Sequence, residues 1–242
     1  MVQQMSGGKF DGGLLKRGDP DYERARRAAV WNARTPERFP DAIVIARSEQ
    51  DVVRAVRLAA AEGMKLGVRS GGHSWAGNHV RDGGMLLDLS QLCDVDVDVD
   101  ATTAAVQPGC RGDQLLTRLG ELGLFFPAGH CIGVALGGYL LQGGYGWNGR
   151  VHGPACMSVE AIDVVLADGR RVHASEQENQ SCCGLRAALG RASSASSPAF
   201  TCGCSRSRRS WRMGCCCSSS SSSRTCSAGH RRSALECHGT WS

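Results

Sequence analysis

Residue 180 divides this sequence into two parts, and only the first has the composition of a folded domain. Up to that point the chain carries 19 basic residues, 22 acidic residues and four cysteines among many apolar runs. After it come nine basic residues, one acidic residue, nine cysteines and six consecutive serines at 218–223. A low-complexity segment of this kind cannot bury enough apolar surface to offset its conformational entropy. We therefore expect a disordered tail over 181–242.

The net charge of +5 belongs to that tail, since the first 180 residues have a net charge of −3. The charge therefore gives no support for a nucleic-acid partner of the folded part. The N-terminal stretch MVQQMSGGKFDGG lacks the apolar segment of a secretory signal peptide. No apolar run approaches the roughly 18 residues of a membrane span. We expect a cytoplasmic protein with reduced thiols and no membrane partner.

Hydrophobic periodicity predicts an α+β fold for the first part. A helix is expected over 22–34. A strand over 41–46, a helix over 48–64 and a strand over 65–69 form a βαβ unit, in which Ser48 is the N-cap of the helix. The strands beyond this unit are expected to be antiparallel.

The remaining elements of the first part are shorter. Strands are expected at 83–90, 93–100 and 102–109, a helix at 112–123 and a hairpin at 158–175. Asp168–Gly169 provides the turn of the hairpin. The stretch VDVDVD alternates strictly and could present a row of metal-binding carboxylates, but a half-exposed strand is the simpler interpretation.

The stretch VRSGGHSWAG at 68–77 predicts a tight loop after a strand. Gly71 and Gly72 permit positive φ angles and let backbone N–H groups approach an anion such as a pyrophosphate. No helix pattern follows directly, so the loop is not the G-x-G-x-x-G fingerprint of a nicotinamide-binding Rossmann fold. From local features alone, His73 is a surface histidine with local hydrogen bonds.

A second glycine-rich stretch, FPAGHCIGVALGGYLLQGGYGWNGRVHGPAC, covers 126–156. It is too apolar for a linker and too rich in glycine for one continuous helix. Such backbone packs closely against a flat ligand or makes several tight turns. Cys131 lies within it, and a buried structural thiol is the ordinary interpretation of a free cysteine.

These two stretches, followed by SVEAIDVVLADGR, resemble the FAD-linked oxidases of the vanillyl-alcohol oxidase and p-cresol methylhydroxylase type. The R-S-G-G-H-S and F-P-A-G-x-C motifs are similar to those of the branch that resembles berberine bridge enzyme. The resemblance covers about 38–180 and implies an FAD-binding domain of that type, incomplete here. In that branch the histidine bonds to the 8α carbon of the flavin and the cysteine bonds to C6. The resemblance therefore implies an FAD held covalently by His73 and Cys131.

Further residues of the same motifs are implied to contact the cofactor, with the 70–74 loop around the pyrophosphate. With the two attachment residues, the implied FAD-binding set is Arg69, Ser70, Gly71, Gly72, His73, Ser74, Gly129, Cys131, Gly137, Gly138, Gly143, Gly144 and Tyr145. No metal site is expected. The catalytic base is unassigned, because His79, His130 and Tyr145 have only their nearness to the motifs in their favour.

The resemblance also implies a reaction. An enzyme of this family moves a hydride from an alcohol, sugar or amine-bearing carbon to flavin N5, and oxygen then reoxidises the flavin with release of hydrogen peroxide. The partners are thus a small-molecule substrate and oxygen. The expected organisation is an N-terminal segment with a helix (1–37), a truncated FAD-binding domain (38–180) and the tail (181–242).

After ASEQEN, the resemblance implies a continuation like D-L-x-W-A-x-R-G-x-G-x-x-F-G-V-V-T, and the tail can be read as such a sequence in another frame. With GC-rich codons for SCCGLRAALGRASSASSPAFTCGCS, a shift of one base upstream gives LLWAARGAGPGFFGVVTRLHLRL. Two bases of each shifted codon are set by the observed residue, so agreement over this length is very improbable by chance. We hypothesise a frameshift near Gln180. The FFGVVT strand is then missing, and we expect the tail to leave its place in the sheet empty.

Two alternatives stay open at this point. The tail cysteines and histidines could form a metal module or a disulfide knot from Cys215–Cys217, Cys226, His230, Cys237 and His238, although the spacings match no established zinc pattern. The whole chain could instead be a non-catalytic or unstable flavin-binding fragment, because the resemblance implies a later domain that forms the substrate pocket and nothing after residue 180 can supply it.

Overall fold

A four-stranded sheet forms the first layer of the computed structural model, which describes residues 9–179, 196–203 and 205–206. Its order is β1 (Leu14–Lys16), β2 (Ala42–Ile45), β4 (Met85–Asp88) and β3 (Leu66–Arg69). Strand β4 is parallel to both of its neighbours, so the expectation that the strands after the βαβ unit are antiparallel was wrong for this one. Periodicity identifies a strand but contains no information about which neighbour it pairs with.

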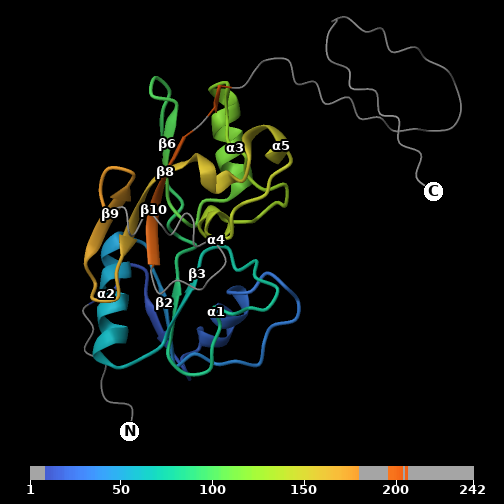
Figure 1. Ribbon diagram of the computed structural model, residues 1–242. Coiled ribbons are helices and arrows are strands. Elements are labelled where there is room, and N and C mark those ends of the chain that lie inside the picture. Colours follow the sequence, from blue (N-terminus) through green and yellow to red (C-terminus); the bar gives the residue numbers. More distant parts are fainter. Residues whose placement is uncertain (1–8, 180–195, 204, 207–242) are drawn as a thin grey trace, which may run out of the picture. The chain divides into compact units, whose positions relative to one another are not determined.

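Helices α1 (Tyr22–Ala28) and α2 (Glu49–Ala61) cover opposite faces of this sheet (Figure 1). Ala42 and Val44 of β2 pack in the α2 cluster, whereas Ile43 packs with Tyr22 of α1. A strand covered on both faces has no polar side, which explains the unbroken apolar run. The predicted cap is confirmed, because the Ser48 hydroxyl accepts a hydrogen bond from the Asp51 N–H at 3.2 Å.

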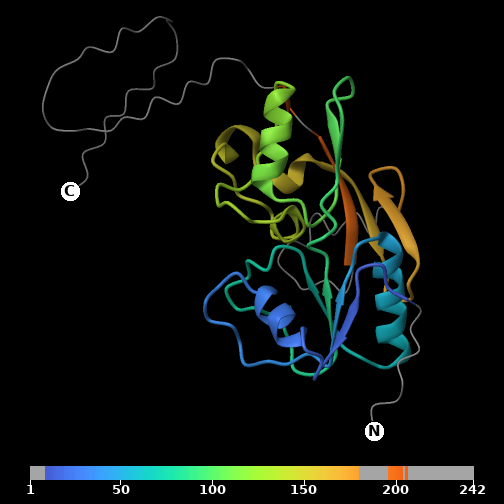
Figure 2. The same ribbon diagram turned by 180° about the vertical axis from the view of Figure 1, so that it is seen from behind.

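A five-stranded antiparallel sheet forms the second layer, seen from behind in Figure 2. Its strands in spatial order are β5 (Val95–Asp98), β6 (Thr103–Val106), β10 (Ser196–Gly203), β8 (Val159–Val165) and β9 (Arg171–Ser175). The predicted hairpin is present as β8 and β9, and Gly169 has the positive φ of +79° that its turn requires. In β5 the valines are half-buried and the aspartates exposed, as expected for a half-exposed strand.

Helix α3 (Gly112–Glu121) and the glycine-rich stretch pack on one core with this sheet. That core includes Leu115, Phe126, Leu136 and Ile162. The glycine-rich stretch forms several tight turns and three short helical elements, namely α4 (Leu136–Leu141), α5 (Gly149–His152) and the 3₁₀ helix η1 (Ala155–Ser158). A two-residue strand before them, β7 (Leu124–Phe125), pairs with β11 (Ser205–Arg206).

Strand β10 corrects one expectation about the tail. We expected its place between β6 and β8 to be empty, yet the backbone of Ser196–Gly203 occupies it. Positions 200 and 202 lie opposite the buried Val106 and Ala104. The pairing with β8 is irregular between Ser196 and Ala199, around Pro198. Proline has no N–H to donate, so it disrupts a central strand at this point.

Candidate functional site

Two loops from distant parts of the chain meet at the candidate site. The 70–74 loop follows β3, and the 129–135 loop precedes α4. A Cβ atom built on Gly71 would lie 2.8 Å from the Ala135 nitrogen, so a larger residue would push the loops apart. A Cβ on Gly133 would lie 3.4 Å from His73 Nε2. The loops that carry His73 and Cys131 are therefore in direct contact.

His73 is half-buried and lies flat against an indole ring. The imidazole and the Trp31 ring are 4.9 Å apart between centroids and only 7° from parallel. Burial lowers the pKa of His73, a hydrogen bond with the Gly133 backbone opposes this shift, and the Arg69 charge adds to it. The ring is thus favoured in the neutral form, which has a nitrogen lone pair available for bond formation.

Cys131 is an exposed free thiol on the second loop. The loop is held by Asp113 of α3, whose Oδ1 accepts a hydrogen bond from the Gly133 N–H at 3.3 Å. Burial raises the pKa of Asp113, but the bonds from Arg111 and the Gly133 N–H together lower it below its usual value. The carboxylate therefore stays charged and keeps the backbone two residues beyond the thiol in place.

Several glycines of the implied flavin set are needed for packing within the protein. A Cβ on Gly72 would lie 2.2 Å from the Ala29 carbonyl oxygen, and a Cβ on Gly137 would lie 2.4 Å from Ser70 Oγ. A Cβ on Gly144 would lie 2.7 Å from the Tyr139 ring. Gly138 differs, because a Cβ there would meet nothing within 4 Å. The space beside Gly138 is open to a ligand, whereas that beside the other three is filled.

Among the remaining residues of the implied flavin set, Arg69 supports the loop, and most of the others stay accessible at the surface. Arg69 makes an ion pair with Asp88 through Nη1 at 2.7 Å and donates from Nη2 to the Ala28 carbonyl at 3.2 Å. Its buried Nε has no hydrogen-bond partner in the described part of the chain. Arg69 therefore supports the loop from behind. Residues of the set that stay half-buried or exposed beside it are Ser70, Ser74, Gly129 and Tyr145, while Gly143 is buried with a φ of +92°.

The three histidine and tyrosine candidates for a base differ in their surroundings. The His79 ring is bonded through Nε2 to the Ala29 carbonyl at 2.9 Å, so it supports the fold. His130 is exposed and lies edge-on to Trp147, and Tyr145 is exposed. Among these only His130 and Tyr145 can reach a ligand.

Two neighbours of the attachment residues were missed by the sequence interpretation. Trp31 lies in the segment expected to be a helix over 22–34, but α1 ends at Ala28, and the Trp31 N–H donates to the Gly72 carbonyl at 3.3 Å. Asp113 was assigned only to a helix. Both contacts join residues that are distant in the sequence, and local patterns contain no signal for them.

The fold and the paired loops define a flavin-binding domain of the vanillyl-alcohol oxidase and p-cresol methylhydroxylase type. Residues 40–175 match the FAD binding domain family, more than half of the chain. The chain belongs to this family of FAD-linked oxidases and is an FAD-binding protein. The prediction made from the two motifs is confirmed at this level.

Two curated relatives illustrate the similarity. An FAD-linked oxidoreductase, nodO, of Hypoxylon pulicicidum is 43% identical over 159 residues, which is 66% of this chain and 35% of that protein. A xylooligosaccharide oxidase of Thermothelomyces thermophilus is 39% identical over 155 residues, which is 63% of this chain and 31% of that protein. This chain thus spans about a third of the length of these relatives.

Solved structures share the fold. The xylooligosaccharide oxidase of Myceliophthora thermophila C1, in complex with xylobiose, superimposes with a TM-score of 0.72 at 32% identity, covering 80% of this chain and 41% of that one. The glucooligosaccharide oxidase of Acremonium strictum superimposes with a TM-score of 0.72 at 29% identity, covering 80% and 40%. That enzyme contains a 6-S-cysteinyl, 8α-N1-histidyl FAD.

Two other expectations concern metals and membranes. Within residues 9–179 and the two short strands beyond them, no group of three or more histidine, cysteine, aspartate or glutamate residues could hold a metal ion. The cysteines and histidines of the hypothetical metal module lie outside the described residues. In the same part of the chain, every helix is too short or too polar to cross a bilayer.

Proposed function

We propose that this domain holds one FAD by two covalent bonds, from His73 and from Cys131. The observation that carries the proposal is the contact between the two loops, since Gly133 lies beside His73 Nε2 and only two residues from Cys131. One planar ring system can reach both side chains only if their loops meet. The bicovalent FAD of the similar glucooligosaccharide oxidase supports the same assignment.

The two residues suit the two bonds chemically. A neutral imidazole is a nucleophile through its nitrogen lone pair, and an exposed thiol becomes one when it loses its proton. Each bond forms as the residue and one flavin carbon each lose a proton, and the electron pair of the broken C–H bond passes to dioxygen. With two protons the dioxygen leaves as hydrogen peroxide. FAD, once bound, supplies hydride acceptance, while the protein supplies attachment and orientation.

The other residues of the set support this FAD in different ways. The 70–74 loop would offer backbone N–H groups to the pyrophosphate of a bound FAD, and Gly138 and Tyr145 would contact its ring system. Gly72, Gly137 and Gly144 act indirectly, because their missing side chains let the loops pack together. Arg69 acts from behind the loop through Asp88 and Ala28.

In the whole enzyme we propose oxidation of a small molecule with hydride transfer to flavin N5 and reoxidation by oxygen. The sugar oxidases among the relatives favour a carbohydrate over an amine. The matched residues, however, cover only about a third of such enzymes. Because the tail can be read as family sequence only in another frame, we propose that this chain binds FAD without turnover, as a fragment whose substrate domain is encoded in that other frame.

The frameshift hypothesis has its own test, which needs no protein. Genomic DNA from independent isolates is sequenced across codons 175–190. We expect one base gained or lost near Gln180 relative to a frame that continues as LLWAARGAGPGFFGVVT. An intact frame that encodes the observed tail in every isolate would contradict the hypothesis.

The covalent attachment is tested by mutation. The chain and its His73→Ala, Cys131→Ala and double variants are incubated with FAD, denatured in acid and separated from free flavin. We expect yellow protein from the first three and colourless protein from the double variant. Release of all flavin from the unchanged chain would refute the covalent assignment.

A further inference from the structure

The plane of the His73 ring is fixed by contacts on two sides. Its face lies on Trp31 at 4.9 Å with a 7° angle between the planes. Its Nε2 edge faces the backbone of Gly133. Stacking restricts rotation of the imidazole about its χ2 angle, and a ring held in one plane keeps its nitrogen directions constant.

The segment that carries Trp31 is joined to the His73 loop by its backbone. The Ala28 carbonyl accepts from Arg69 at 3.2 Å, the Ala29 carbonyl is bonded to His79 at 2.9 Å, and the Trp31 N–H donates to Gly72 at 3.3 Å. The Ala29 carbonyl also fills the space beside Gly72. Ala28, Ala29 and Trp31 thus contact the 70–74 loop or the residues that flank it.

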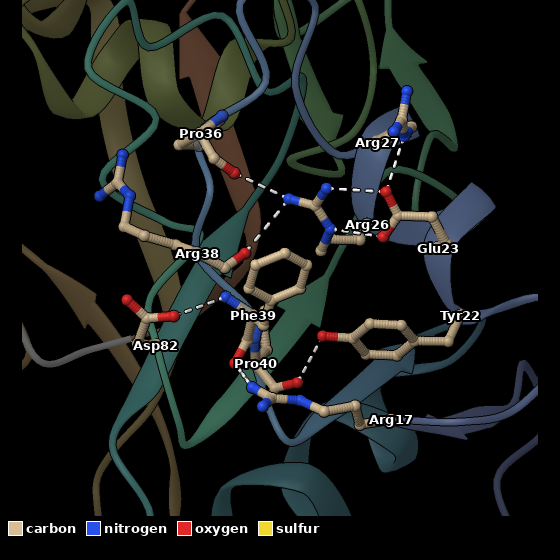
Figure 3. Close-up of polar contacts among 10 residues, drawn as sticks. All are labelled: Arg17, Tyr22, Glu23, Arg26, Arg27, Pro36, Arg38, Phe39, Pro40 and Asp82. Carbon is tan, nitrogen blue, oxygen red and sulfur yellow. Dashed lines mark hydrogen bonds and ion pairs between the residues drawn. The ribbon is translucent and has the colours of Figure 1, made fainter.

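The far end of this segment is held by a buried arginine (Figure 3). Arg26, 4% exposed, makes two hydrogen bonds with the Glu23 carboxylate and donates from Nη1 to the Pro36 carbonyl at 2.7 Å and the Arg38 carbonyl at 3.2 Å. Its guanidinium lies 4.4 Å from the centre of the Phe39 ring. The loop from 29 to 38, which carries Trp31, is therefore held by hydrogen bonds at both ends.

We propose that Trp31 is a positioning residue that orients the His73 imidazole for its bond to FAD, an inference that rests on the proposed function. Trp31 lies before residue 40, outside the matched family domain. In the bond-forming step one His73 nitrogen and the flavin 8α carbon each lose a proton. The electron pair of the broken C–H bond passes to dioxygen, which leaves as hydrogen peroxide. Trp31 takes no part in this exchange and acts by holding the nitrogen toward the carbon.

The test uses the Cys131 bond as an internal reference. The full chain is incubated with FAD and digested, and mass spectrometry counts flavin joined to His73, to Cys131 and to both. Trp31→Ala is expected to lower the share joined to His73 roughly two- to tenfold, the range of an aromatic pair, while the share joined to Cys131 remains. Trp31→Phe, which keeps an aromatic face, restores most of the loss.

Trp75→Ala is the matched control, because it removes a 79% exposed indole that meets Trp31 edge-on. It should leave the ratio of the two bonds unchanged. An unchanged ratio in Trp31→Ala, or an equal loss of both bonds, would overturn the positioning role. If the unchanged chain carries no covalent flavin at either residue, the proposed function itself fails, and the inference falls with it.

A second measurement needs no flavin. The protons of an imidazole stacked on an indole resonate at higher field than those of a free ring. We expect this shift for His73 in the unchanged chain and in Trp75→Ala, and its loss in Trp31→Ala. Identical His73 resonances in all three proteins would show that the stack does not form and would also overturn the inference.

Discussion

At the scale of single residues, Gly137 and Gly138 are neighbours in α4 with opposite surroundings. A Cβ on Gly137 would lie 2.4 Å from Ser70 Oγ and 2.8 Å from Pro108 Cβ, whereas a Cβ on Gly138 would meet open space. Gly137→Ala should lower the free energy of unfolding by about 1–3 kcal/mol through overpacking. Gly138→Ala should raise it by up to about 1 kcal/mol, since alanine favours helix. Urea unfolding of both variants checks this, and equal stability of the two would contradict the packing.

His79 provides a prediction about pH. The pKa of His79 is lowered by burial, and the bond to the Ala29 carbonyl offsets only part of this shift. The unfolded chain, with a histidine pKa of about 6.5, therefore binds a proton before the folded chain does. The stability that neutral His79 contributes is therefore fully present above the unfolded pKa of about 6.5. It decreases as the pH falls from there toward the lower pKa of His79 in the folded state.

We expect the urea midpoint of unfolding to decrease between pH 7.5 and pH 5.5. The decrease should be smaller in His79→Gln, which cannot titrate, and unchanged in His130→Gln, which alters an exposed ring. A decrease of the same size in all three proteins would show that His79 does not contribute.

At the scale of elements, Arg26 and Arg27 of α1 form a natural pair for comparison. Both bond to Glu23, and the bonds from Arg26 first and Arg27 second lower the pKa of that carboxyl to about 2. Only Arg26 is buried and reaches the Pro36 and Arg38 carbonyls.

Arg26→Ala should therefore cost about 1–3 kcal/mol, because the partly buried Pro36 and Arg38 carbonyls lose the donor that the buried guanidinium supplies. Arg27→Ala should change stability by no more than about 1 kcal/mol, as for an exposed ion pair. Thermal unfolding of the two variants is the measurement. Similar midpoints for both would contradict the role of Arg26 in closing the 29–38 loop.

The helices, strands and turns could largely be predicted from nearby residues, but which elements pack or pair with one another could not. The Ser48 cap, the alternation of β5 and the turn at Gly169 depend on nearby residues, and all three are present. The position of β4 between β2 and β3 depends on long-range pairing. The same holds for the site, where the motifs identify His73 and Cys131 but contain no signal for Trp31 or Asp113.

At the scale of the whole molecule, β10 connects the fold to the frameshift hypothesis. In the shifted frame its eight positions read VVTRLHLR in place of SSPAFTCG. That sequence has leucine at positions 200 and 202, opposite the buried Val106 and Ala104, and histidine at position 201, opposite the exposed Ala105. It also replaces Pro198 where the pairing with β8 is irregular.

We expect a frame-restored protein to unfold at higher urea concentration, to bind more FAD and to release peroxide with sugars. The 242-residue chain should bind less FAD and release none. Substituted valine and leucine side chains each contribute roughly 1.5–3 kcal/mol when buried, against a typical domain stability of about 5–15 kcal/mol. Equal flavin content and turnover in the two proteins would refute the functional consequence of the frameshift.

In the proposed holo-protein, one FAD joins two loops of this domain. This linkage is tested most directly by incubating the chain with FAD, digesting it under denaturing conditions and searching for a single flavin that links two peptides. We expect a species in which the peptide containing His73 and the peptide containing Cys131 share one FAD. Complete recovery of both peptides without flavin, from protein that had bound FAD before denaturation, would contradict it.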